Sequence, residues 1–467
     1  MLKSALISSG ILIAAVLLNA SRAEVVQPIS ADALRDEISY LSSEKLDGRL
    51  TPSPGLELAA DYIASKFQNS GLEPAAPQYF QSAKFDQAKI DFRGFTLNLS
   101  DSAKEVSIQA SEVRVQSLAG LDVKAERILK LPANGIIPNV TGRVVAGDES
   151  RYNDEVLLNA LIARRPALVL IVGKTDHTPP SPLAPDPAVF VDEDGNSVPI
   201  IHIHKSEARD LLHKGDELKL SVHLAPPQLK KAAVRNVVGT LPGSDPVLRN
   251  QFVLVTAHYD HMGRNARGYF PGANDNASGT ASVIEIAKAL ASTGTHPKRS
   301  IIFMALFGEE EGLLGAYYYA HHPLVPLKDT VADINLEQMG RTDDPSGKHI
   351  REFGLTGPSF SNVQDIVSAA AKDEGINVYV RKDADLYFDR SDNFAFAQFG
   401  IVAHTAAVAF EYRDYHEISD TPEKIDYANL AAVDRGLAAG VAAIANASRR
   451  PQWSNSPGAV VYRTAGR

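Results

Sequence analysis

The chain has 467 residues, of which 44% are hydrophobic and 22% charged, and this length allows a large catalytic domain plus a smaller one. The absence of cysteine excludes disulfides, thiolate metal ligands and cysteine nucleophiles, so any metal site must use histidine and carboxylate side chains. The net charge of −9, without a dense basic patch, argues against nucleic acid as a partner.

Residues 1–23 have the pattern of a removable export signal. A basic start at Lys3 precedes an apolar run from Ile7 to Leu18, and a small-x-small cleavage pattern ends at Ala23. The run is shorter than the roughly 20 apolar residues that span a bilayer. No other segment is expected to cross a membrane. We therefore expect the mature chain to be exported, to the periplasm or the medium, without stable membrane insertion.

The pattern of apolar residues divides the rest of the chain into two domains and a tail. Residues 24–116 and 228–448 combine helical spacing with apolar strands that alternate with helices, which predicts an α/β domain with a mostly parallel mixed sheet and helices on both faces. Residues 117–227 contain short β-rich runs between Pro, Gly and Asp clusters, which predicts a small β-rich insert. Residues 449–467 are expected to form a flexible tail.

Five separated acidic or histidine residues adjoin the predicted strands. They are His258, Asp275, Glu310, Glu337 and His416. Ligands of parallel sheets bind beyond the carboxyl ends of the strands, so we expect these side chains to lie together. Carboxylate oxygens and imidazoles without sulfur suit zinc, with manganese or cobalt possible.

The sequence around these residues indicates further roles. Asp260 follows His258 by two residues and can hold the imidazole N–H that does not bind metal. Asp275 lies in a loop that opens a helix, where one carboxylate can lend an oxygen to each of two metals. In the triplet Glu309–Glu311, one acid can bind metal while its neighbour faces the water that it deprotonates. The triplet alone leaves the register open.

Five segments carry a family resemblance. AHYDHMG, PGANDNASGT, FGEEEGLLGA, NLEQMGR and YHEISDT, in this order and at these separations, resemble the di-zinc aminopeptidases of the family that also contains glutamate carboxypeptidase. The segments LDGRLTPSPG and AADYIASKF are similar to the N-terminal pattern of that family, and the resemblance ends near Ser448. The insert resembles the protease-associated domain often found in the family.

The resemblance implies a ligand set. His258 and Glu337 would bind one zinc ion, Glu310 and His416 would bind the other, and Asp275 would bridge the two. The commonest family residue at position 337 is Asp, so the longer Glu337 bears on metal preference.

The resemblance also implies the catalytic residues. Asp260 would orient His258, Glu309 would be the general base, and Tyr415 would help to stabilise the oxyanion. Glu311 occupies the variable position of the family pattern. The implied activity is that of an exported metallo-aminopeptidase, which hydrolyses the N-terminal peptide bond of peptides with water activated by two zinc ions.

Three alternatives remain open at this point. A carboxypeptidase or dipeptidase on the same metal centre would need an arginine cluster, for which the candidates are Arg264, Arg267, Arg341 and Arg390. A receptor-like relative would have lost ligands or the base, and a one-zinc glutaminyl cyclase would be revealed by metal counting.

Six further histidines are set aside. His202 and His204 are interpreted as a solvent-facing pair, and His261, His321, His322 and His404 as structural.

Overall fold

The protein is described from a computed structural model, which covers residues 29–465 apart from 133–136, 153–154, 163, 174–187, 190–197 and 216. The predicted export signal, residues 1–23, lies outside the described residues. Export therefore remains a prediction.

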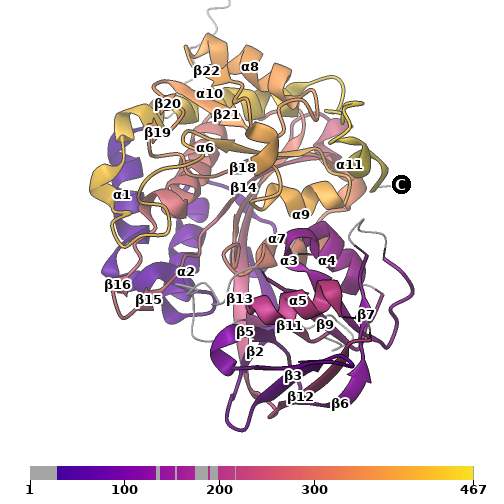
Figure 1. The fold of residues 1–467 in the computed structure, drawn as a ribbon. Helices are drawn as coiled ribbons and strands as arrows, with labels where there is room; N and C mark the ends of the chain where they lie inside the picture. The colour runs from indigo at the N-terminus through magenta and orange to yellow at the C-terminus, as the bar shows by residue number, and fades with distance from the viewer. Residues whose placement is uncertain are drawn as a thin grey trace, which may run out of the picture.

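A mixed sheet, ten-stranded within the described residues, runs through the larger part of the molecule (Figure 1). Its order is β10-β2-β13-β17-β14-β18-β23-β21-β22, with β1 beside β13; the short strands β10 and β1 are Ala188–Val189 and Glu73–Pro74. The four central strands are parallel, and the order across them is β17 (Ser300–Leu306), β14 (Phe252–His258), β18 (Thr330–Leu336) and β23 (Ala403–Ala407). On one side, β13 (Gln228–Leu241) pairs antiparallel with β17 and with β2 (Phe80–Lys89). On the other side, β21 (Glu352–Leu355) is antiparallel to β23, and β22 (Asn377–Tyr379) runs parallel to β21. The parallel centre confirms the predicted α/β class.

Helices cover both faces of this sheet (Figure 1). One group consists of α1 (Ala31–Leu41), α2 (Pro54–Asn69), α6 (Gly279–Ala291), α8 (Val363–Asp373) and α10 (Tyr427–Asn446), and the other of α7 (Leu314–His321) and α9 (Asn393–Gln398). Every residue of β17, β18 and β23 is buried between them, which explains why these strands are rich in apolar residues and do not alternate between apolar and polar ones. Ser30 and Ser53 cap α1 and α2 by accepting the N–H groups of Ala33 and Leu56.

The helix α10 is long and apolar enough to cross a membrane by length and composition alone, which the sequence analysis overlooked. In the structure 67% of its apolar window is buried, and the helix packs against α8, α6 and α1. The apolar composition of α10 is therefore explained by its place in the core.

The insert forms two sheets of its own (Figure 1). The strands β5 (Val113–Gln116), β11 (Ile200–Ile203), β9 (Leu168–Val172), β8 (Val144–Asp148) and β7 (Leu129–Lys130) form one of them. The other contains β4 (Glu105–Ile108), β3 (Thr96–Ser100), β12 (Lys219–Leu224) and β6 (Leu121–Arg127). Residues 96–116, predicted as part of the peptidase domain, thus pair with insert strands, because Leu97 and Leu99 share a core with Val222. The insert begins before residue 117.

The C-terminal segment also differs from its prediction as a flexible tail. Trp453 is buried in the main core and donates its indole N–H to the Gly400 carbonyl at 3.1 Å. Tyr462, in α11 (Val460–Ala465), packs 5.4 Å from the Trp453 ring, centroid to centroid. The prediction failed because Trp453 stands among turn residues, without a periodic apolar pattern. The segment that reaches residue 465 packs against the core.

Candidate metal centre

The carboxyl ends of three parallel strands bring the predicted site together. His258 is the last residue of β14, Glu310 follows β17 and Glu337 follows β18 directly. Asp275 lies in the irregular turn Ala273–Ser278 that opens α6, and His416 lies in the loop after β23. The structure therefore gathers all five predicted ligands at one edge of the sheet.

Three of these side chains form a first half-site. The Nε2 atom of His258 lies 3.4 Å from Oδ1 of Asp275 and 3.2 Å from Oε2 of Glu337. All three residues are buried. Ser391 donates its hydroxyl to Oε2 of Glu337 at 2.9 Å, which fixes the longer side chain at position 337.

A second half-site shares Asp275. The Nε2 atom of His416 lies 3.1 Å from Oδ2 of Asp275 and 3.2 Å from Oε2 of Glu310. The two oxygens of Asp275 thus face different histidines. A carboxylate in this arrangement can bridge two metal ions.

The surroundings of His258 agree with the role predicted for Asp260. Oδ1 of Asp260 lies 3.4 Å from Nδ1 of His258, on the side of the ring opposite the half-site, and accepts the backbone N–H of Glu309 at 3.1 Å. Thr280 donates its hydroxyl to the His258 carbonyl. Asp260 therefore links the ring of the histidine to the backbone of the predicted base.

His261 was wrongly set aside as structural. Its Nδ1 lies 2.7 Å from Oε1 of Glu310 and 3.9 Å from Oδ2 of Asp275, and the ring is fully buried. Because Oε2 of Glu310 faces His416, His261 holds the other oxygen of the same carboxylate. Its position three residues after His258, in the loop that leaves β14, was the signal that could have found it.

His404, by contrast, has a structural environment. It is buried between the Ser361 hydroxyl, at 2.6 Å, and the Thr356 carbonyl, at 2.7 Å. Burial lowers the pKa of His404 to about 4. A neutral ring in these contacts serves packing and not metal binding.

The predicted base and oxyanion residue border the half-sites. Oε2 of Glu309 lies 3.9 Å from Nε2 of His258, and burial raises the pKa of Glu309 well above its usual range. The ring of Tyr415 stacks on that of His416 at 3.9 Å between centroids and is 47% exposed. Glu309 thus lies beside the first half-site and Tyr415 at the open side of the second.

Glu311 has a different neighbour from the other two acids of the triplet. Burial raises the pKa of Glu311 to about 8, against the opposing charge of Arg114. Arg114 belongs to β5, the edge strand of an insert sheet. The insert therefore approaches the metal centre from this side.

The donor set fits zinc. Donors about 2.0–2.2 Å from a common tetrahedral ion lie roughly 3.3 Å apart, close to the separations in both half-sites. Without a cation the proton is held by the imidazole: although burial lowers the pKa of His416, hydrogen bonds with Asp275 and Glu310 raise it to about 11. Within the described residues, the groups of side chains spaced to hold a metal ion all lie here. The site can therefore hold metal ions.

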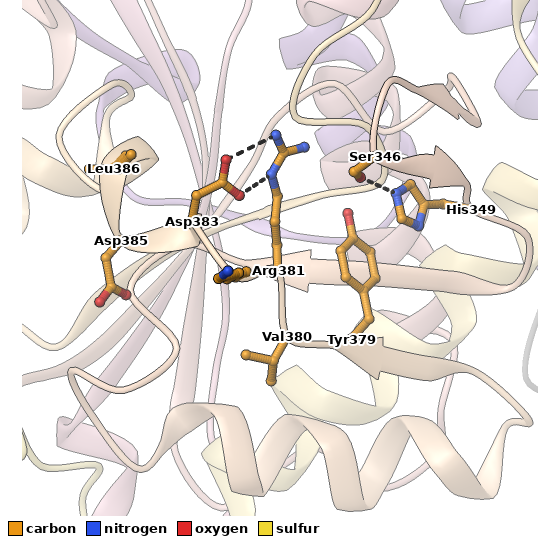
Figure 2. Close-up of a pocket in the computed structure, with 9 residues that line it drawn as sticks. Ser346, His349, Tyr379, Val380, Arg381, Asp383, Asp385 and Leu386 are labelled. Atoms are coloured by element: carbon orange, nitrogen blue, oxygen red, sulfur yellow. Dashed lines mark hydrogen bonds and ion pairs between the residues drawn. The ribbon is translucent and has the colours of Figure 1, made fainter.

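A separate hollow of about 680 Å³ lies away from this centre, around β22. Figure 2 shows Arg381 directed at the Asp383 carboxylate, with the His349 ring alongside Tyr379. Arg381 also binds Asp344 at 2.8 Å, and the rings of His349 and Tyr379 stack at 4.3 Å. None of the predicted ligands lines this hollow, so it does not belong to the candidate site.

Comparison with known proteins finds a family whose model matches the segment that holds this centre. The model of Peptidase family M28 matches residues 236–441. The aminopeptidase YwaD of Bacillus subtilis is 30% identical over 198 residues, 42% of this chain and 38% of its own. A probable zinc metalloprotease of Leptosphaeria maculans is 35% identical over 136 residues, 28% of this chain and 31% of its own. The chain thus matches about a third of the length of these curated relatives.

Solved structures share the fold over a longer stretch. An aminopeptidase from Aneurinibacillus sp. strain AM-1 has a TM-score of 0.59 and 21% identity, with 93% of this chain and 98% of that chain covered. A zinc aminopeptidase from Bacillus subtilis has a TM-score of 0.50 and 21% identity, covering 89% and 94%. The segment matched by the family model contains all five predicted ligands and Glu309. As the motifs predicted, residues 236–441, which hold the metal centre, match the model of peptidase family M28.

Proposed function

We propose that this chain is an exported aminopeptidase that binds two zinc ions and removes the N-terminal residue of peptides. The observation that carries the proposal is the position of Asp275, whose Oδ1 faces His258 while its Oδ2 faces His416. A carboxylate shared between two metal positions needs this arrangement. The M28 family of the domain and the names of its relatives support the peptidase activity.

The buried acids supply the proton transfers of the proposed reaction. Bound zinc ions would polarise the scissile carbonyl and lower the pKa of water near them. Glu309, beside the first half-site, would accept the proton of the attacking water and deliver it to the leaving amine. The hydroxyl of Tyr415 would donate to the developing oxyanion.

The arginines favour an aminopeptidase over a carboxypeptidase. A carboxypeptidase would need free guanidinium groups for the substrate carboxylate. Three of the four candidate arginines are paired with acids of the chain: Arg264 with Glu44 at 3.1 Å, Arg267 with Glu417 at 3.1 Å, and Arg341 with Asp414 at 2.8 Å. The guanidinium of Arg390 lies over the Tyr387 ring. The free amine of a substrate would instead meet the acidic side chains of the centre.

A matched pair of substrates tests the activity. Leucine anilide and N-acetyl-leucine anilide differ only in the free amine, and an N-blocked dipeptide with a free carboxylate tests the alternative. We expect hydrolysis of the free-amine anilide alone, with loss on chelation and recovery on addition of zinc. Cleavage of the blocked dipeptide but not of the anilide would contradict the proposal.

N-terminal sequencing of the protein recovered outside the cytoplasm tests export, with Glu24 expected as the first residue.

A further inference from the structure

One buried arginine joins the two chain segments that carry His258 and Asp275, two of the three ligands of the first half-site. Arg49 is 1% exposed, and its side chain donates to four backbone carbonyls. The acceptors are Tyr259 at 2.7 Å, Pro271 at 2.8 Å, Gly272 at 3.1 Å and Leu41. Tyr259 directly follows His258, and Gly272 lies three residues before Asp275. One guanidinium therefore connects the end of β14 to the loop that holds the shared carboxylate.

The backbone around Arg49 is anchored to the same region. The Arg49 carbonyl accepts the N–H of His261 at 3.2 Å, and Gly263 donates to the Gly48 carbonyl at 2.9 Å. A Cβ on Gly48 would lie 2.3 Å from the Gly263 carbonyl oxygen, so the two segments approach as closely as backbone allows. The anchoring leaves the side chain of Arg49 little room to move.

The charge of Arg49 also opposes the charges of the metal centre. Burial lowers the pKa of Arg49 to about 10, while the carboxylates of Asp260, Asp275, Asp420 and Glu310 favour its charged form. Its hydrogen bonds nevertheless go to backbone carbonyls, which are neutral acceptors and could also accept from a different donor. The planar fork of arginine spans acceptors that one ammonium group cannot reach together.

A buried acid holds the same loop from its amide side. Oδ2 of Asp420 accepts the backbone N–H groups of Asn274 at 3.0 Å and Asp275 at 3.1 Å, and the hydroxyl of Tyr412 at 3.2 Å. Asp420 is fully buried and follows His416 by four residues. The loop 271–275 is therefore bound at its carbonyls by a cation and at its amides by an anion.

We propose that Arg49 and Asp420 are positioning residues, which hold Asp275 between the two half-sites by clamping the loop 271–275 from both sides. The inference rests on the metal centre of the proposed function. It assigns a role to the N-terminal segment LDGRL, which contributes no metal ligand.

The chain supplies a matched control in Arg299. This side chain is equally buried, at 1% exposed, and also donates to backbone carbonyls, those of Ile444, Ala445 and Ala447 at the end of α10. None of these acceptors adjoins a metal ligand. A purely structural effect of losing a buried guanidinium should therefore be the same in Arg299→Lys and Arg49→Lys.

Zinc affinity of the folded protein, measured by competition with a chromophoric chelator, separates the two effects. We expect Arg49→Lys and Asp420→Asn to bind zinc about 10–100-fold more weakly than wild type, the usual cost of losing a partner that orients ligands. Arg299→Lys should lower the melting temperature but keep wild-type zinc affinity. Excess zinc should restore kcat in Arg49→Lys without changing KM for the anilide.

Two kinds of result would overturn the proposal in whole or in part. Wild-type zinc affinity in Arg49→Lys or in Asp420→Asn removes that residue from it. Failure of both Arg49→Lys and Arg49→Gln to fold, even with excess zinc, would assign Arg49 a structural role. Because chelator competition needs no catalysis, a chain that binds zinc but hydrolyses nothing would contradict the proposed function and leave this inference standing.

Discussion

Two of the clusters of buried acids in the described part of the chain differ in their partners. At the metal centre, Asp275, Glu310 and Glu337 are gathered with imidazoles. Between α1, α6 and α10, Glu37, Glu285 and Asp434 are equally buried. The acids of this helix cluster form ion pairs with lysines: Lys66 lies 3.0 Å from Glu37, and Lys288 lies 2.8 Å from Glu285.

The difference shows what distinguishes a metal site from a structural acid cluster. In the helix cluster, burial raises the pKa of Glu37 to about 7 and that of Asp434 well above its usual range, so protons and ammonium groups neutralise the acids. At the metal centre, nitrogen and oxygen atoms of different side chains converge and lie 3.1–3.4 Å from one another. Burial of acids is common to both, and only the convergence of donors indicates metal.

The largest effect is expected for Glu309→Gln. The amide keeps the shape of the side chain but cannot accept a proton, so kcat for leucine anilide should fall by about 10²–10⁴-fold. Zinc content, measured by elemental analysis, should stay at the wild-type value. Glu311→Gln is the control, because the charge of its carboxyl is opposed by Arg114 of the insert, and it should change kcat far less. Equal losses in both variants would contradict the assignment of the base.

Asp275→Asn breaks the shared ligand of the metal centre. Loss of the bridging charge should weaken zinc binding at both half-sites by more than the roughly 100-fold typical of partners outside the ligand set. Glu285→Gln removes an equally buried acid from the helix cluster and should leave zinc binding unchanged. If Glu285→Gln weakened binding as much as Asp275→Asn, the distinction between the clusters would fail.

The acids of the helix cluster should make the free energy of unfolding depend on pH. The raised pKa of Glu37 means that the folded state binds more protons than the unfolded state between about pH 4.5 and 7. Its contribution to the free energy of unfolding therefore decreases as pH rises through this window. Glu37→Gln should gain on the order of 3 kcal/mol relative to wild type between pH 5 and pH 8. Denaturant unfolding at the two pH values measures the gain, and parallel pH profiles would contradict it.

Much of the site could be predicted from the sequence because parallel strands deliver their last residues to one edge. His258 and Glu337 end or follow apolar strands, which are the strongest signals in the chain. His261 was missed because its partner, Glu310, lies 49 residues away and no short-range pattern links them. The roles of Arg49 and Asp420 were missed for the same reason, since both act on backbone groups of a distant loop.

The fold was predicted less well where pairing is non-local or apolar residues are sparse. Strand β3 joins β12, more than a hundred residues later, so nothing near Thr96 marked it as part of the insert. Trp453 docks on the core as an isolated aromatic residue among turn residues. Periodicity detects amphipathic elements, and neither of these features is periodic.

Titration of the metal-stripped protein with zinc, followed by calorimetry, tests the central claim most directly. The bridging position of Asp275 predicts two equivalents of zinc bound per chain, with both equivalents weakened in Asp275→Asn. Saturation at a single equivalent, or two equivalents that remain unchanged in Asp275→Asn, would contradict a two-zinc centre built on this carboxylate.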